Sequence, residues 1–319
     1  MTLKNPIEEA FIQAVEDIVA SITRQESTLA EQLTKLDQHL KQAKLKGWLR
    51  YQVTTLNAIS IAHMVYADNN PEHVLAILRE ALGIAEQTDD LTIKLKIINN
   101  IAYQLISTFF DFEGAEKQID HGWALFEESG GTPSVIALFL LANKSSLCTT
   151  RGDFAKAKQF LDRAFALADD VIINEVDRND YYRMINILRD ARIMINMAHK
   201  QFDNLLDDIK LNKEIYEKLY KTDINVPYYA NMALYRLICE QDPTGYETWI
   251  SKFNYGDTLA SLDLIRYLKH LNYYPQALGV INRVLDTYTA GENLVLDGVI
   301  QNLLQEAKDG MQKSTGLPE

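Results

Sequence analysis

The stretch from Arg151 to Ala164 constrains the fold of this chain most, because it combines a helix stop, a helix start and a close helix contact. Gly152 can adopt the left-handed backbone conformation that ends a helix, and Asp153 can cap the helix that follows. Ala157 and Ala164 are seven residues apart, so they lie on one face of that second helix, where small side chains let another helix approach closely. The stretch therefore predicts a hairpin of two tightly packed helices.

The same succession of residues recurs along the chain. A proline or aromatic residue opens each second helix, at Pro71, Phe112, Phe154, Phe202 and Tyr274. The residues ten positions later, several of them small, are Ala81, Gly122, Ala164, Asn212 and Val284. The openers lie 41, 42, 48 and 72 residues apart, and the long last interval predicts a further, degenerate repeat near Asn225 to Phe253.

These turns resemble those of tetratricopeptide (TPR) repeats, whose second half reads G-D/N-Y/F-x-x-A with a small residue seven positions on. The first helices carry an Asn followed by a small residue, as in Asn99-Asn100-Ile101-Ala102, Ala142-Asn143-Lys144-Ser145 and Tyr229-Ala230-Asn231-Met232-Ala233. This resembles the N-N-I-G or N-L-G phrase of the long TPRs in bacterial signalling proteins. The resemblance covers roughly residues 48 to 290. It implies a right-handed α-α superhelix, a TPR-like solenoid.

Long stretches without Pro or Gly predict an all-α protein. We expect about six helical hairpins in one continuous solenoid domain, with capping helices in residues 1–46, repeats in 47–291 and a C-terminal helix and tail in 292–319. The expected helices and hairpins, in chain order, are Pro6–Thr23, Ser27–Lys46, Trp48–Ala67, Pro71–Gln87, Leu91–Phe110, Phe112–Glu128, the hairpin Pro133–Ala168, Glu175–His199, Phe202–Lys221, Tyr246–Phe253, Thr258–Leu271, Tyr274–Tyr288 and Asn293–Met311.

Composition excludes several classes of function. The net charge of −12 argues against nucleic-acid binding, which requires a basic surface. The chain has two cysteines, Cys148 and Cys239, and both lie in helical apolar patterns. This sparse use of cysteine fits a reducing compartment. The N-terminus lacks a signal-peptide pattern, and the longest apolar run, Val135 to Ala142, is too short to span a bilayer. We expect a cytoplasmic protein with no membrane association.

No catalytic motif, metal-ligand spacing or cofactor fingerprint is apparent, so we predict no catalytic residue, no metal and no cofactor, and no enzyme activity. In stacked hairpins the first helices line a concave groove that binds the ligand. Amides there can pair with the backbone of an extended peptide, and arginines can meet an acidic group. The candidate groove residues are Asn57, Asn100, Gln104, Asn143, Asn186, Arg189, Arg192, Asn231 and Arg236. Alternatively, each Asn bonds to neighbouring backbone and stabilises helix packing.

The resemblance implies a non-enzymatic binding and sensing module. It would recognise a peptide or protein segment in its groove and relay that signal to a regulatory partner or output domain. A structural scaffold in a larger complex is an alternative, and an enzyme built on a helical solenoid is a third. The tail, Ser314-Thr315-Gly316-Leu317-Pro318, resembles the opening of GGDEF-type diguanylate cyclase domains but departs from it at Gln312, Ser314 and Glu319. The chain could thus be the sensory region of such a cyclase.

The last helix carries an apolar stripe formed by Leu296, Val299, Ile300, Leu303, Leu304, Ala307 and Met311. A terminal helix has one neighbour only, so this stripe must pack on Val284 and Leu285 or face a partner. Two interpretations follow: the helix docks on the last hairpin, or it pairs two chains in a homodimer.

Overall fold

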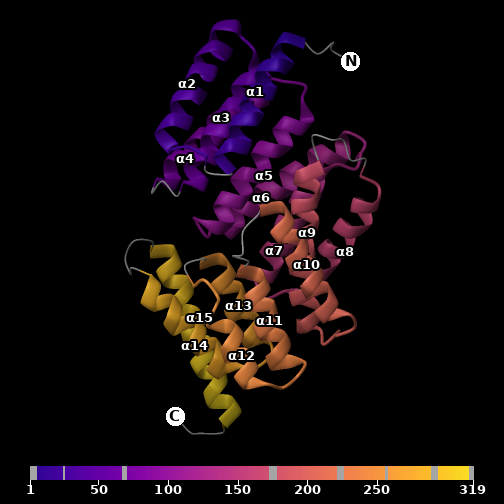
Figure 1. The fold of residues 1–319 in the computed structure, drawn as a ribbon, viewed down its shortest axis with the longest axis vertical. Helices are drawn as coiled ribbons and strands as arrows, with labels where there is room; N and C mark the ends of the chain where they lie inside the picture. Colours follow the sequence, from indigo (N-terminus) through magenta and orange to yellow (C-terminus); the bar gives the residue numbers. More distant parts are fainter. Residues whose placement is uncertain are drawn as a thin grey trace. The chain divides into compact units, whose positions relative to one another are not determined.

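The computed structural model describes residues 6–23, 26–66, 70–171, 178–220, 226–255, 258–288 and 294–315, and the regular structure of these residues is entirely α-helical (Figure 1). The all-α class expected from the sequence is confirmed. The helices are α1 (Pro6–Thr23), α2 (Leu29–Lys46), α3 (Leu49–Val65), α4 (Pro71–Ala85), α5 (Leu91–Ser107), α6 (Phe112–Glu128), α7 (Val135–Thr150), α8 (Phe154–Asp169), α9 (Arg178–Ala198), α10 (Leu205–Tyr220), α11 (Val226–Ile238), α12 (Pro243–Ile250), α13 (Thr258–His270), α14 (Tyr274–Thr287) and α15 (Leu294–Thr315).

The chain divides into two compact units, Met1–Thr132 and Pro133–Glu319, where the sequence analysis expects one continuous solenoid. In the first unit α3 pairs with α4 and α5 with α6, while α1 and α2 both pack on α3. In the second unit the hairpins are α7–α8, α9–α10, α11–α12 and α13–α14, and α15 packs on α14 and α13. Both units are therefore built from antiparallel helix pairs.

The turn between α7 and α8 has the predicted chemistry. Gly152 has a φ of 79°, in the left-handed region, and the side chain of Asp153 accepts a hydrogen bond from the backbone N–H of Lys156 at 3.0 Å. Ala157 and Ala164 have no exposed surface. Ser145 on α7 donates to the backbone carbonyl of Ala157 at 3.0 Å, which places the two helices in close contact at that alanine.

Side-chain caps also open three other second helices, α4, α6 and α12. Asn70, Asp111 and Asp242 each accept a hydrogen bond from the backbone N–H three residues on, at 3.1, 2.8 and 2.8 Å. A helical hairpin, α11–α12, occupies the region where the sequence predicts a degenerate repeat. The predicted start of its second helix, at Tyr246, is wrong by three residues, because Asp242 caps the helix and Pro243 takes its first position.

The helix α13 is enclosed on most of its circumference. Ser261, Leu262, Leu264, Ile265, Arg266, Tyr267 and Leu268 are all buried. The helix contacts α7, α9 and α11, and the ring of Tyr267 lies 4.8 Å from that of Phe154 at the start of α8. Contacts between first helices in the second unit therefore extend beyond sequence neighbours, because α13 lies against α7 and α9 as well as against α11.

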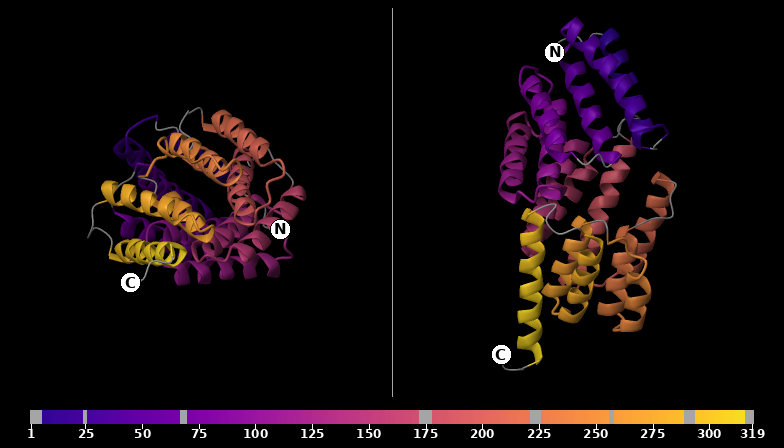
Figure 2. Two further views of the ribbon diagram at one scale, coloured as in Figure 1. Left: turned by 90° about the horizontal axis from the view of Figure 1, so that it is seen from below. Right: turned by 90° about the vertical axis from the view of Figure 1, so that its left-hand side faces the viewer.

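The last helix packs within its own chain. Leu296, Ile300, Leu303 and Ala307 are buried, and α15 contacts α14 and α13 (Figure 2). The apolar stripe of α15 thus packs on the last hairpin, as the first interpretation predicts. Pairing of two chains through this helix stays a prediction. Residues 316–319, which carry most of the resemblance to a cyclase opening, lie outside the described residues.

Replacing Ala157 by Arg tests the close contact between α7 and α8. A long cation at this enclosed position should lower the free energy of unfolding by roughly 3–5 kcal/mol, because the charge would be buried without a partner. Ala155→Arg, at an exposed position of the same helix, is the matched control and should change stability by less than about 0.5 kcal/mol. Equal urea midpoints for the two variants would contradict the observed phase of α8.

Candidate functional site

Two first helices of the first unit are joined by an amide pair. Asn100 on α5 donates through Nδ2 to Oδ1 of Asn57 on α3 at 2.7 Å. Both side chains are half-buried, and each belongs to the partly exposed stripe of its helix. On α3 this stripe runs through Arg50, Thr54, Asn57, Ile61 and Met64, and on α5 through Thr92, Lys96, Asn100, Tyr103 and Ser107.

An exposed aromatic residue lies one turn beyond this amide pair. Tyr103 keeps 47% of its surface exposed. Gln104, next to it, is buried and donates to the sulfur of Met64 on α3, while its oxygen accepts from Thr108 at 3.2 Å. The amide of Gln104 therefore ties α5 to α3, and Tyr103 faces outward beside it.

The second unit contains a polar junction of three helices. Asn231 on α11 donates through Nδ2 to Asp190 on α9 at 2.9 Å, and Asn212 on α10 also hydrogen-bonds this carboxyl group. Asn212 in addition donates to the backbone carbonyl of Asn186 at 3.2 Å. Asn186, Asn212 and Asn231 are buried, so α9, α10 and α11 meet through side chains that are polar and enclosed.

The environment of Asp190 changes its proton affinity strongly. Its carboxyl group is enclosed, although the residue as a whole keeps some exposure. Burial raises the pKa of Asp190 to about 7, and the hydrogen bonds from Asn212 and Asn231 counteract part of this rise. The folded chain therefore retains this proton at pH values where an unperturbed Asp is ionised.

The candidate arginines have partners within the chain. Arg192 lies 3.8 Å from the carboxylate of Asp208 and stacks over the ring of Phe165, with 4.3 Å between the guanidinium carbon and the ring centroid. Arg236 pairs with Glu240 one turn away. Arg189 is half-buried on α9. Two of the three arginines are thus already neutralised by neighbouring carboxylates.

The nine predicted groove residues fall into two groups. Asn57, Asn100 and Gln104 lie together on α3 and α5 of the first unit. The other six lie in the second unit, where Asn186 and Asn231 meet at the Asp190 junction and Asn143 is half-buried on α7. Side-chain hydrogen bonds at Gln104 and Asn231, and burial at these two residues and at Asn186, fit the alternative in which amides stabilise helix packing.

Three residues of these clusters were missed by sequence reasoning: Tyr103, Asp190 and Asn212. A signal existed for the acid. Asn57 and Asp190 each lie eight residues before the end of their helices, while Asn100, Asn143 and Asn231 lie seven before theirs. Asp190 thus stands at the place in α9 where the other first helices carry an Asn. For Asn212, the signal was a polar residue at a position where other second helices carry a small or apolar one.

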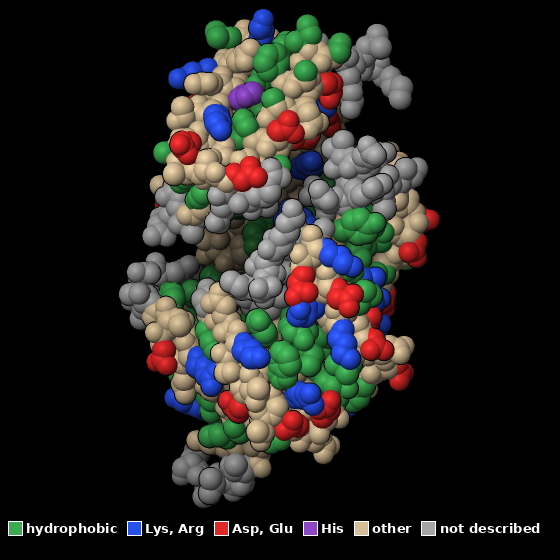
Figure 3. Space-filling model, in the orientation of Figure 1, with side chains coloured by type: hydrophobic (Ala, Val, Ile, Leu, Met, Phe, Trp, Pro, Cys, Tyr) green, Lys and Arg blue, Asp and Glu red, His purple; other side chains and the backbone are tan. Residues whose placement is uncertain are grey.

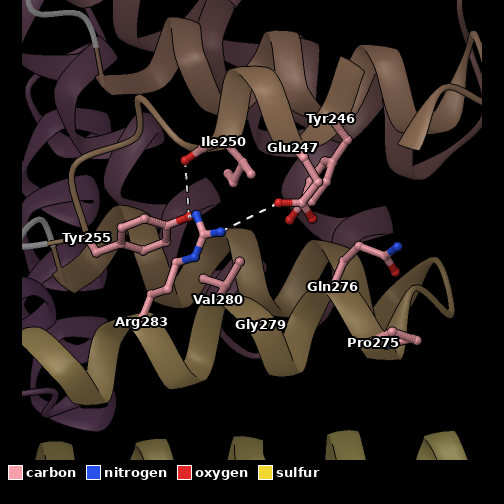
Figure 4. A pocket seen from close by; sticks show the side chains of 9 residues that line it. All are labelled: Tyr246, Glu247, Ile250, Tyr255, Pro275, Gln276, Gly279, Val280 and Arg283. Atoms are coloured by element: carbon pink, nitrogen blue, oxygen red, sulfur yellow. Dashed lines mark hydrogen bonds and ion pairs between the residues drawn. The ribbon is translucent and has the colours of Figure 1, made fainter. Parts of the chain in front are cut away.

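A shallow cavity of about 150 Å³ lies between α12 and α14 (Figure 4). Arg283 donates to the hydroxyl of Tyr255 at 2.7 Å and lies 3.5 Å from Glu247, and Tyr255 donates to the carbonyl of Ile250 at 3.1 Å. Burial raises the pKa of Tyr255, against the opposing effect of Arg283. The lining residues are Tyr246, Glu247, Ile250, Tyr255, Pro275, Gln276, Gly279, Val280 and Arg283.

This cavity suits a side chain rather than a cofactor. Small-molecule sites usually measure about 300–1,000 Å³.

Within the described ranges, no three His, Cys, Asp or Glu side chains come together as a metal-binding group. Burial raises the pKa of the Cys239 thiol to about 11, which keeps it protonated at neutral pH. None of the helices in the described part of the chain has the length and apolar composition that a bilayer crossing needs.

Comparison with models of known protein families found no match, and a search of curated proteins found no similar sequence.

The floor of the cavity can be tested with Gly279. A Cβ added there would meet nothing within 4 Å, so Gly279→Ala should raise the free energy of unfolding by about 0.5–1 kcal/mol through helix propensity alone. Gly298→Ala on α15, where the added Cβ is equally unobstructed, is the matched control. Both variants are measured by urea unfolding. If Gly279→Ala lowered stability while Gly298→Ala raised it, other atoms would have to occupy the space beside Gly279, and the open cavity floor would be contradicted.

Proposed function

We propose that this protein is a non-enzymatic binding module that recognises a peptide or protein segment along the α3–α5 strip. This strip consists of Thr54, Asn57 and Ile61 on α3 with Lys96, Asn100 and Tyr103 on α5. We also propose that the hairpins of each unit follow the right-handed winding of TPR-like repeats, which places such strips on the inner faces of the first helices. The exposed ring of Tyr103 beside the Asn57–Asn100 amide pair is the observation that carries the proposal.

The chemistry of the strip suits an extended segment. Amides both donate and accept hydrogen bonds, so they can pair with peptide groups of any sequence. A tyrosine adds a large contact area at a small cost in conformational entropy, which explains its enrichment at protein interfaces. Ile61 is half-buried on the same strip and extends the apolar contact. Together these side chains provide a polar register and an aromatic anchor.

The first unit is the better place for this binding. In the second unit α13 lies against α7, α9 and α11. Asn186 is buried, and the side-chain NH2 group of Asn231 is bonded to Asp190. The net charge of −12 disfavours a polyanionic ligand. On the face seen in Figure 3, Lys and Arg side chains are interspersed with Asp and Glu side chains, so this face shows no extended basic area for a polyanion. We further propose that binding of the segment is signalled to a regulatory partner or output domain.

Selection of peptides from a displayed random library on the full chain, followed by affinity measurement, tests this function. Tyr103→Ser should weaken binding of the selected peptides at least tenfold, since an interface aromatic commonly contributes 2 kcal/mol or more. Tyr182→Ser, at a comparably exposed tyrosine of α9, is the matched control and should leave the affinity unchanged. Selection of no peptide, or equal affinity for both variants, would contradict the proposal and favour a scaffold that uses other surfaces.

A further inference from the structure

Three enclosed side-chain oxygens at the Asp190 junction lack a hydrogen-bond donor within the described part of the chain. The side-chain oxygens of Asn186, Asn212 and Asn231 are all enclosed, and none has a donor among the described residues. A carboxylate adds only further acceptors, whereas a neutral carboxylic acid supplies one O–H donor. Since buried acceptors without donors are costly, the protonated form of Asp190 suits this cluster better than the charged form.

Charged groups on the neighbouring helices do not compensate a negative charge on Asp190. Its proton affinity is set by burial and by the two amides, with no contribution from a charged side chain of the described residues. The ion pairs on α9 and on the helices packed against it are Lys158–Asp162, Arg192–Asp208, Lys213–Glu217, Arg236–Glu240 and Arg266–Asp263. Other charged residues there are Lys144 on α7, Lys156, Arg163 and Asp169 on α8, Arg183 and Arg189 on α9, Asp207, Lys210, Glu214 and Lys218 on α10, and Lys269 on α13, which also carries His270.

The first unit shows that this chain can join first helices without a titratable group. There Asn57 and Asn100 pair amide to amide, at positions equivalent to those of Asp190 and Asn231. An Asn in place of Asp190 would provide its neighbours with both a hydrogen-bond donor and an acceptor at any pH. The carboxyl group on α9 therefore makes the stability of this junction depend on pH, whereas the stability of the Asn57–Asn100 pair in the first unit does not.

We infer that the junction of α9, α10 and α11 is a proton-operated latch, in which the neutral acid of Asp190 holds the three helices together and loss of its proton loosens α10 and α11 from α9. In the closed state the proton lies on the carboxyl group, which therefore carries no charge while it accepts the amide hydrogen bonds of Asn212 and Asn231. When the proton leaves for solvent, the junction retains an enclosed anion without a counter-ion. Opening exposes that anion to water and removes the cost.

The direction of the pH effect follows from the pKa of Asp190. The value is about 7 in the folded chain and about 3.9 for an unperturbed Asp, so the closed junction binds the proton more tightly than the open one. The stabilisation by this proton is complete below about pH 4 and is lost as the pH rises to about 7. The junction should therefore open more readily at pH 8 than at pH 5.

Hydrogen exchange of the full chain tests the latch, measured by mass spectrometry from pH 5 to pH 8 and corrected for the intrinsic pH dependence of amide exchange. Protection of peptides from α10 and α11 should fall tenfold or more over this range, while peptides from α3 and α4 serve as an internal reference. Asp190→Asn should abolish this fall, because an amide does not titrate. Asp286→Asn, at an exposed carboxylate of α14, should keep the behaviour of the parent chain.

Three outcomes would overturn the latch: constant protection of α10 and α11 in the parent chain, an equal fall in α3 and α4, or a fall that persists in Asp190→Asn. The first two concern the parent chain alone, so the test does not depend on how the variant folds.

Discussion

Close approach of two helices within the hairpins α3–α4, α5–α6 and α7–α8 is the contact on which the rest of the structure depends. It requires a position in the second helix where little or no side chain separates the backbones, and Ala81, Gly122 and Ala164 meet that requirement because all three are buried. Caps such as Asp153 fix where these second helices begin and therefore which residue enters the contact. Turn chemistry and packing thus specify the same register.

The α9–α10 hairpin departs from this rule and acquires different chemistry. Asn212 occupies the position of the small residue, and an enclosed amide must find hydrogen-bond partners. It finds them in the backbone of Asn186 and the carboxyl group of Asp190, which in turn engages Asn231 of the next hairpin. One polar substitution in the packing position accompanies a buried polar junction, where the first unit has only an amide pair. The stability of this hairpin consequently depends on protonation.

Sequence reasoning predicted the helices and turns well because these depend on local chemistry. The bounds of α1 and α6 agree with prediction to the residue, while α5 ends at Ser107, before the predicted Phe110, whose φ of 52° is left-handed. The site was harder to predict. Asn57, Asn100, Asn143 and Asn186 recur at intervals of 43 residues, but spacing does not reveal whether an amide meets a ligand or the next helix. Contacts of α13 with α7 join residues more than a hundred positions apart, and no local pattern predicts them.

A crystal structure of the full chain with a selected peptide bound would test the proposed binding site most directly. Peptide density along α3 and α5, with hydrogen bonds to Asn57 or Asn100 and a side chain against the ring of Tyr103, is the expected result. A peptide bound elsewhere, for example in the cavity between α12 and α14, with Tyr103 still exposed to solvent, would contradict it.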